Sequence, residues 1–211
     1  METVLIFAGG DGDATTPLAD ELPVAELVIA ADSGYDLAVS QGFPVDVLVG
    51  DLDSLRTPVE EIPRHVLVDR HPVDKDSTDL ELALERVMDD LPSRVVVVGG
   101  AWGRIDHELA IAALLCSSRW QEIEEIDWVT GRGRAHVVRG RRILHGDVGD
   151  IVSLIPMGGP VRGVTTRGLR WDLDGDSLYP GTSRGVSNEL TGPLADIRVE
   201  EGCLLAVMPS A

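Results

Sequence analysis

The chain has 211 residues, 44% of them hydrophobic and 26% charged, a composition that suits one large globular domain or two smaller ones. Its formal net charge of -18 repels nucleic acid and anionic membranes, so we expect neither as a partner. The two cysteines, Cys116 and Cys203, have no CxxC spacing, and the first eight residues do not resemble a signal peptide. We therefore expect a cytoplasmic protein.

The first part of the chain alternates runs of β-branched residues with helical patterns. Strands are expected at residues 4–8, 27–31, 45–49, 66–68 and 95–98, and helices at 35–41, 78–90 and 107–117. This alternation predicts an α/β fold, a mostly parallel, Rossmann-like sheet flanked by helices.

The pattern changes after about Asp127, where helical periodicity ends and glycines and aspartates separate short apolar runs. Strands are expected at residues 128–130, 135–138, 151–155, 163–165, 197–200 and 204–208. These runs predict a small all-β sandwich or barrel. The sequence therefore predicts an α/β domain at 1–127 and a β domain at 128–211.

Glycine and aspartate recur where the predicted parallel strands end. The four segments are Gly9-Gly10-Asp11, Asp32-Ser33-Gly34, Gly50-Asp51-Leu52-Asp53 and the run from Gly99 to Arg104. Ligands of such sheets bind at the carboxyl ends of the strands. We therefore expect a ligand site at this edge.

The common phosphate-binding loops are absent from the sequence. The single lysine, Lys75, lies between Asp74 and Asp76, which excludes the Gly-Lys-Ser/Thr of a Walker A loop. Thr15 stands where the dinucleotide fingerprint needs its third glycine. A nucleotide site in so acidic a chain would need a metal ion or nearby arginines.

Two acidic segments are candidate metal sites. Asp51 and Asp53 follow a strand and can both reach one Mg²⁺, although an isolated pair of this kind is equally typical of a solvated turn. The segment from Asp74 to Asp79 precedes a helix, where acidic residues also serve as caps. Capping alone does not account for so many carboxylates around the only lysine.

Two further motifs suit phosphate and aromatic ligands. In the run from Gly99 to His107, glycines allow close backbone approach and Arg104 supplies a cationic fork, while Asp106 and His107 either orient a ligand or cap a helix. Later, Trp171 is followed by a glycine-rich turn ending in Ser187 and Asn188. A lone tryptophan is usually a core residue, and such serines and asparagines usually belong to turns.

Taken in order, these motifs resemble the thiamin pyrophosphokinase family. The shared patterns are GDLDS, D-x-D-x-T-D, GG-x-x-GR-x-DH, GL-x-W and S-x-G-x-SNE, all found between Asp32 and Glu189. The chain departs from the family at Ala101-Trp102, in lacking an asparagine after His107, and at Asp172, where proline is common.

The resemblance implies an enzyme that transfers diphosphate from ATP to the hydroxyl of thiamin and releases AMP. It implies a homodimer with sites at the interface and a requirement for Mg²⁺, which Asp51, Asp53 and Asp79 would bind. Asp76 would assist the metal or remove the hydroxyl proton, and Arg104 would stabilise charge on the transferring diphosphate.

The resemblance also implies substrate-binding residues in both domains. Asp32, Thr78 and Asp106 would position nucleotide or phosphate groups. Trp171 would stack on the pyrimidine of thiamin, with Ser187 and Asn188 completing that pocket. A thiazolium cation suits an aromatic face and acidic surroundings.

Three other functions fit parts of the sequence. A strand ending in Asp51 is also typical of aspartate-dependent phosphatases, in which Asp51 would accept the phosphoryl group. A related enzyme would use another heteroaromatic alcohol, such as a hydroxymethylpterin. A non-catalytic module would sense thiamin or a nucleotide without turnover.

Overall fold

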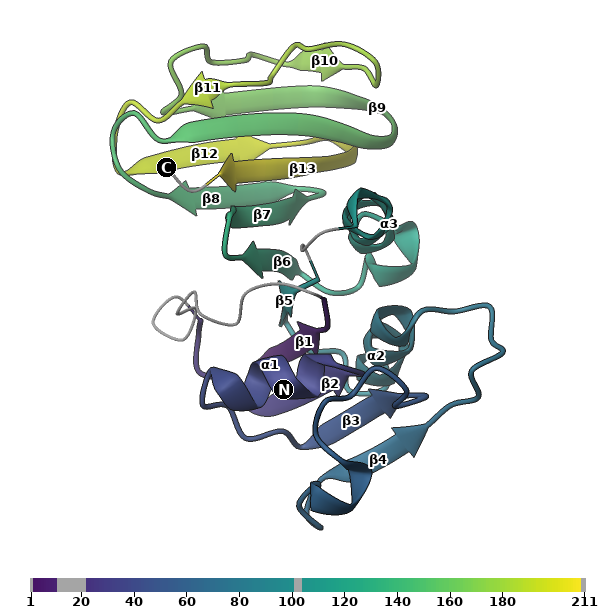
Figure 1. Cartoon of the computed structure of the whole chain (residues 1–211). Helices are drawn as coiled ribbons and strands as arrows, with labels where there is room; N and C mark the ends of the chain where they lie inside the picture. Colours follow the sequence, from purple (N-terminus) through teal and green to yellow (C-terminus); the bar gives the residue numbers. More distant parts are fainter. Residues whose placement is uncertain (1, 11–21, 101–103, 210–211) are drawn as a thin grey trace. The chain divides into compact units, whose positions relative to one another are not determined.

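A computed structural model describes residues 2–10, 22–100 and 104–209 (Figure 1). The chain forms two compact units, one of Met1–Ile111 with Glu122–Gly131 and the other of Ala112–Gln121 with Arg132–Ala211. Within the described ranges, no helix combines the length and the apolar character needed to cross a membrane.

The first unit contains a parallel sheet with the strand order β4-β3-β2-β1-β5-β6. The strands are β1 (Thr3–Ala8), β2 (Leu27–Ala31), β3 (Val47–Gly50), β4 (Leu67–Arg70), β5 (Arg94–Gly99) and β6 (Glu125–Thr130). Its helices are α1 (Gly34–Ser40) and α2 (Asp79–Val87), with a short 3-10 turn at Val59–Glu61. The helix α3 (Ile105–Leu115) begins in the first unit and ends in the second, which also contains the 3-10 turn Ser118–Trp120.

Burial explains why the valine-rich runs form the centre of this sheet. Val95, Val96, Val97 and Val98 of β5 are all fully buried, although successive side chains point to opposite faces. A strand that is covered on both faces needs a continuous apolar run rather than an alternating one. The predicted parallel α/β sheet is therefore confirmed.

The last strand of this sheet extends beyond the predicted one. The strand expected at 128–130 is the end of β6, which pairs in parallel with β5 through Val97↔Trp128 and Val98↔Val129. The Trp128 indole also donates a 2.8 Å hydrogen bond to the carbonyl oxygen of Gly99. The parallel sheet therefore continues past residue 127.

The second unit is antiparallel, with the strand order β7-β13-β9-β12-β8 and with β10 and β11 paired to β9. Its strands are β7 (Gly133–Val138), β8 (Arg141–His145), β9 (Ile151–Arg167), β10 (Asp176–Leu178), β11 (Asn188–Glu189), β12 (Leu194–Arg198) and β13 (Glu201–Pro209). The predicted all-β character of this region is confirmed.

One long strand replaces two predicted short ones. The runs expected at 151–155 and 163–165 are both parts of β9, which has 17 residues. Its first half pairs with β13 and its last three residues pair with β12, with a register shift between Glu201 and Cys203 of β13. Gly158 and Gly163 have positive φ values of 71° and 62°, so glycine bends a continuous strand here.

The difference in burial between Leu84 of α2 and Leu67 of β4 gives a test of how α2 packs in the first unit. Leu84 is fully buried, whereas Leu67 on β4 is 56% exposed. Leu84→Ala is expected to lower the free energy of unfolding by about 2–5 kcal/mol, because it leaves a cavity. The matched change Leu67→Ala is expected to cost less than about 1 kcal/mol. Urea denaturation measures both values, and equal losses would contradict the packing described for α2.

Candidate active site

Three carboxylates meet where β2 and β3 end. Asp32 follows β2, Asp51 follows β3, and Asp79 is the first residue of α2. The two strands are parallel neighbours, and the Asp32 amide donates a 2.8 Å hydrogen bond to the Val49 carbonyl. One carboxylate oxygen from each aspartate lies within 4.8 Å of the others. We call this group the carboxylate cluster.

The backbone around the carboxylate cluster depends on Gly50. Its φ is 144°, and a Cβ built there would lie 2.9 Å from Asp79 Oδ1 and 3.3 Å from Asp32 Cβ. Asp32 itself has a φ of 47°, a left-handed conformation that non-glycine residues adopt infrequently. A glycine at position 50 therefore lets the carboxylates approach one another.

Lys75 partly neutralises the cluster. Its Nζ lies 2.8 Å from Asp51 Oδ2 and 3.1 Å from Asp79 Oδ1, and its side chain is 13% exposed. Burial opposes the charged form of Lys75, but the two carboxylates outweigh it and raise the pKa of the amine. The Lys75 hydrogen bond in turn lowers the pKa of Asp51. One lysine thus balances one of three acidic groups.

Burial and the negative charge that Lys75 does not balance both affect the protonation of Asp32, whose pKa is raised. Burial raises its pKa, a hydrogen bond from Ser54 lowers it, and the negative charges of Asp79 and Asp51 raise it further. Among the described residues, Oδ1 of Asp32 and Oδ1 of Asp79 are buried without an accepted hydrogen bond of good geometry. Buried carboxylate oxygens of this kind are the ligands that Mg²⁺ prefers, so the cluster fits a divalent cation.

Three other predicted site residues of the first unit, Asp53, Asp76 and Thr78, are exposed. Asp53 is exposed: its amide donates to Asp51 Oδ1 at 3.2 Å, and its carboxylate accepts from Ser54 Oγ at 3.0 Å. Asp76 is exposed, and Thr78 caps α2 by accepting a 3.2 Å hydrogen bond from the Glu81 amide. The cluster does not include Asp53 in this conformation.

Arg104 and Asp106 form an exposed ion pair at the start of α3. Arg104 Nη2 lies 2.6 Å from Asp106 Oδ2, and both side chains are more than 60% exposed. The hydrogen bond from Arg104 lowers the pKa of Asp106 to about 2. Residues 101–103 of the predicted run from Gly99 to Arg104, and Asp11 of the predicted segment Gly9-Gly10-Asp11, lie outside the described residues.

Asn188 holds the backbone of Trp171 in the second unit. Its Oδ1 accepts a 3.0 Å hydrogen bond from the Trp171 amide, and its Nδ2 donates a 2.9 Å bond to the Trp171 carbonyl. Asn188 is buried, while the Trp171 side chain is 54% exposed with the Arg170 guanidinium 4.8 Å from its ring centroid. Ser187 has a φ of 57°, and its amide donates to Ser153 Oγ. Asn188 therefore positions an accessible aromatic ring.

Sequence reasoning missed two features of the carboxylate cluster. It gave Asp32 a substrate-positioning role, whereas the structure places Asp32 beside Asp51 and Asp79. It noted Lys75 as the single lysine within an acidic segment but gave it no role, whereas the structure places Lys75 between Asp51 and Asp79. The available signal was the position of the only lysine within a run of acidic residues, just before the helix that Asp79 begins.

A parallel sheet with three carboxylates gathered at its carboxyl edge is an arrangement that suits a metal-dependent enzyme. Two family models match the chain: the thiamin pyrophosphokinase catalytic domain over residues 18–126 and the thiamin pyrophosphokinase vitamin B1 binding domain over residues 136–204. The chain belongs to the thiamin pyrophosphokinase family, and its enzyme class is thiamine diphosphokinase.

Relatives support this assignment along the whole chain. Thiamine pyrophosphokinase 1 of Oryza sativa subsp. japonica is 30% identical over 84% of this chain and 69% of its own length. Thiamine pyrophosphokinase of Bacillus subtilis (strain 168) is 26% identical over 98% of both chains. The crystal structure of the Bacillus subtilis thiamine pyrophosphokinase has a TM-score of 0.85 at 23% identity over 100% of both chains, a likeness of fold.

The two ion pairs of Lys75 give a test of the cluster. Lys75→Met is expected to lower the free energy of unfolding in EDTA by about 1–3 kcal/mol, because two partly buried carboxylates lose their countercharge. Added Mg²⁺ should narrow that deficit, since the ion supplies positive charge. Lys75→Arg keeps the charge and is the control. A deficit that Mg²⁺ does not change would contradict a cation site at this cluster.

Proposed function

We propose that the enzyme transfers the diphosphate of ATP to the hydroxyl of thiamin through a magnesium site formed by the carboxylate cluster. The observation that carries this proposal is the carboxylate cluster itself: Oδ1 of Asp32 is buried without a hydrogen bond from the described residues, and the only positive charge beside Oδ1 of Asp79 among those residues is the Lys75 ammonium. When bound, Mg²⁺ would neutralise phosphate oxygens and so let an acidic site accept ATP.

The chain's own residues would then orient the reactants. Asp51 and Asp79 would hold the metal, with Asp32 as the third carboxylate and Asp53 as a further proposed ligand. Lys75 would keep Asp51 and Asp79 in place, because its Nζ already contacts both. Asp76 would assist the metal or take the hydroxyl proton, and Thr78 would position phosphate while it caps α2.

Charge on the moving diphosphate would be stabilised by Arg104. Its pairing with Asp106 is exposed and hence weak, so a phosphate can compete for the guanidinium. In the second unit, Trp171 would stack on the pyrimidine of thiamin, with Asn188 fixing its backbone and Ser187 completing the pocket. An exposed indole at a fixed position suits a flat cationic ligand.

Two broader features belong to this proposal. A homodimer with sites at its interface would follow the family resemblance, and sedimentation equilibrium would measure it. Both Cys116 and Cys203 are free thiols, which suits a reducing compartment and supports a cytoplasmic enzyme.

A product assay with thiamin, ATP and Mg²⁺ tests the reaction. AMP and thiamin diphosphate are expected in equal amounts, and both should vanish with EDTA, because the acidic site needs a cation to accept ATP. ADP with thiamin monophosphate would indicate transfer of a single phosphoryl group. Thiamin binding without product would favour a sensing module, and failure to bind thiamin would favour another alcohol such as a hydroxymethylpterin.

Substitution of single aspartates separates the metal ligands. Asp51→Asn is expected to lower kcat by about 100-fold or more, because it removes a ligand charge and the anchor of Lys75. Asp53→Asn is expected to raise the Mg²⁺ concentration needed for half-maximal activity. Asp89→Asn changes an exposed aspartate in the turn that follows α2 and is the control. Full magnesium-dependent activity in Asp53→Asn would remove Asp53 from the metal site.

A trapped aspartyl-phosphate on Asp51 would favour the phosphatase alternative.

A further inference from the structure

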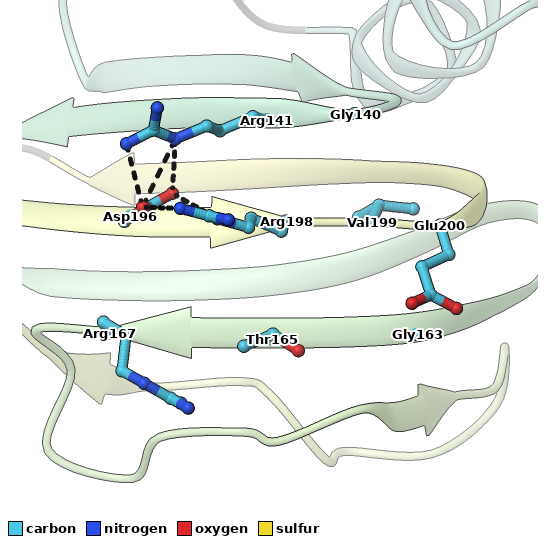
Figure 2. A pocket seen from close by; sticks show the side chains of 9 residues that line it. All are labelled: Gly140, Arg141, Gly163, Thr165, Arg167, Asp196, Arg198, Val199 and Glu200. Atoms are coloured by element: carbon cyan, nitrogen blue, oxygen red, sulfur yellow. Dashed lines mark hydrogen bonds and ion pairs between the residues drawn. The ribbon is translucent and has the colours of Figure 1, made fainter.

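A hollow lined by arginines lies on the sheet of the second unit, over β8, β12 and the end of β9 (Figure 2). Its volume of about 670 Å³ is within the range of small-molecule sites. It is lined by Gly140, Arg141, Gly163, Thr165, Arg167, Asp196, Arg198, Val199 and Glu200. We call it the arginine groove, and none of the residues predicted to bind thiamin lines it.

Strand register brings the three arginines to one face of the sheet. Arg198 lies opposite Arg141 on β8 and opposite Thr165 on β9, while Asp196 lies opposite Arg167. Residues two apart on a strand share a face, so these side chains line the groove together. The intervening Ile197 is fully buried in the core beneath.

Arg141 and Arg198 share one carboxylate. Like charges directly opposite one another on paired strands are unfavourable. Asp196 relieves this repulsion, since Arg141 Nη2 lies 3.1 Å and Arg198 Nη2 lies 3.0 Å from its Oδ2 (Figure 2). The hydrogen bonds from Arg141 and Arg198 lower the pKa of Asp196, which stays ionised. One carboxylate between two guanidinium groups leaves one positive charge uncompensated.

Arg167 adds a third guanidinium that is already held in place. Its Nη1 donates to the carbonyl oxygens of Thr166 and Leu173 at 2.7 and 3.2 Å. Its ion pair is with Asp174 at 2.8 Å, a side chain that is 84% exposed, so this pair contributes little. The hydrogen bond to Asp174 raises the pKa of Arg167, and the nearby charge of Arg198 opposes that rise.

The other end of the groove is acidic. Glu200 lies directly over Gly163, where a Cβ would collide with its side chain. A bound anion would therefore lie at the arginine end, away from Glu200. The lining carries three positive and two negative charges, although the chain has 36 acidic and only 18 basic residues.

We propose that the arginine groove binds a small phosphate-bearing anion through Arg141, Arg198 and Arg167. Within the described part of the chain, Nη1 of Arg141 and Nη1 of Arg198 donate no hydrogen bond. Guanidinium forks match the oxygens of phosphate, and a phosphate would relieve the part of the repulsion between Arg141 and Arg198 that Asp196 leaves. Free pyrophosphate, AMP and thiamin diphosphate all carry this chemistry.

Equilibrium binding in EDTA tests the proposal without any need for turnover, so the proposed reaction can fail without affecting the result. Pyrophosphate, AMP and thiamin diphosphate are titrated separately by calorimetry, and at least one is expected to bind with a stoichiometry of one per chain. Arg141→Gln combined with Arg198→Gln should raise the Kd of that ligand by about 10-fold or more, because charge-assisted hydrogen bonds are lost. Asp196→Asn should lower the Kd of the same ligand, since a carboxylate that competes for the two arginines is removed.

Arg162→Gln is the matched control, because Arg162 is an exposed arginine of β9 that pairs with Glu201 at 2.9 Å and does not line the groove. It should leave binding unchanged. Thermal unfolding checks that each variant is folded, and Arg167→Gln replaces the double variant if that one is not. Equal binding by the groove variants and Arg162→Gln would overturn the proposal. So would the absence of binding of all three ligands to the unsubstituted protein.

Discussion

Repulsion among three carboxylates acts at the ends of β2 and β3, where partial burial strengthens it. Several local features follow from this constraint. Gly50 gives the carboxylates room to approach, Lys75 offsets part of their charge, and the pKa of Asp32 rises with burial and with the charge of its neighbours. The fold holds these three carboxylates together although they repel one another. A divalent cation bound between them would make the electrostatic energy of the cluster favourable.

The second unit has the opposite electrostatic arrangement. There the strand register places guanidinium groups opposite one another and leaves a single carboxylate between Arg141 and Arg198. In both units, like charges are gathered on a sheet or at the ends of its strands and are only partly neutralised by the chain itself. Such sites are pre-organised for a ligand of opposite charge, since little reorganisation remains to be done on binding.

The sequence predicted the elements whose signals are local. The four valines of β5 have the continuous apolar run of a strand covered on both faces, and Asp32 and Asp51 follow strand ends that parallel pairing brings to one edge. The motif order identified the family. The division into an α/β part and a β part depended on the loss of helical periodicity, which is also a local signal.

The features that the sequence did not predict depend on pairing between segments that are distant in the chain. The continuity of β9 was missed because the glycines between the apolar runs at 151–155 and 163–165 indicated two separate short strands, whereas pairing with β13 and β12 keeps the strand extended. The contact between Lys75 and Asp51 joins residues 24 apart, and the arginine groove requires Arg141 to lie opposite Arg198. No short pattern in the sequence specifies either register.

The lysine that neutralises the cluster is also the only lysine in the sequence. The chain therefore has a single side-chain primary amine, and it lies in the candidate active site rather than on an open surface. Amine-reactive labels, which usually scatter over a protein surface, would here modify one side chain. Chemical access to that amine would report directly on whether the carboxylates or a ligand enclose it, with no engineered probe.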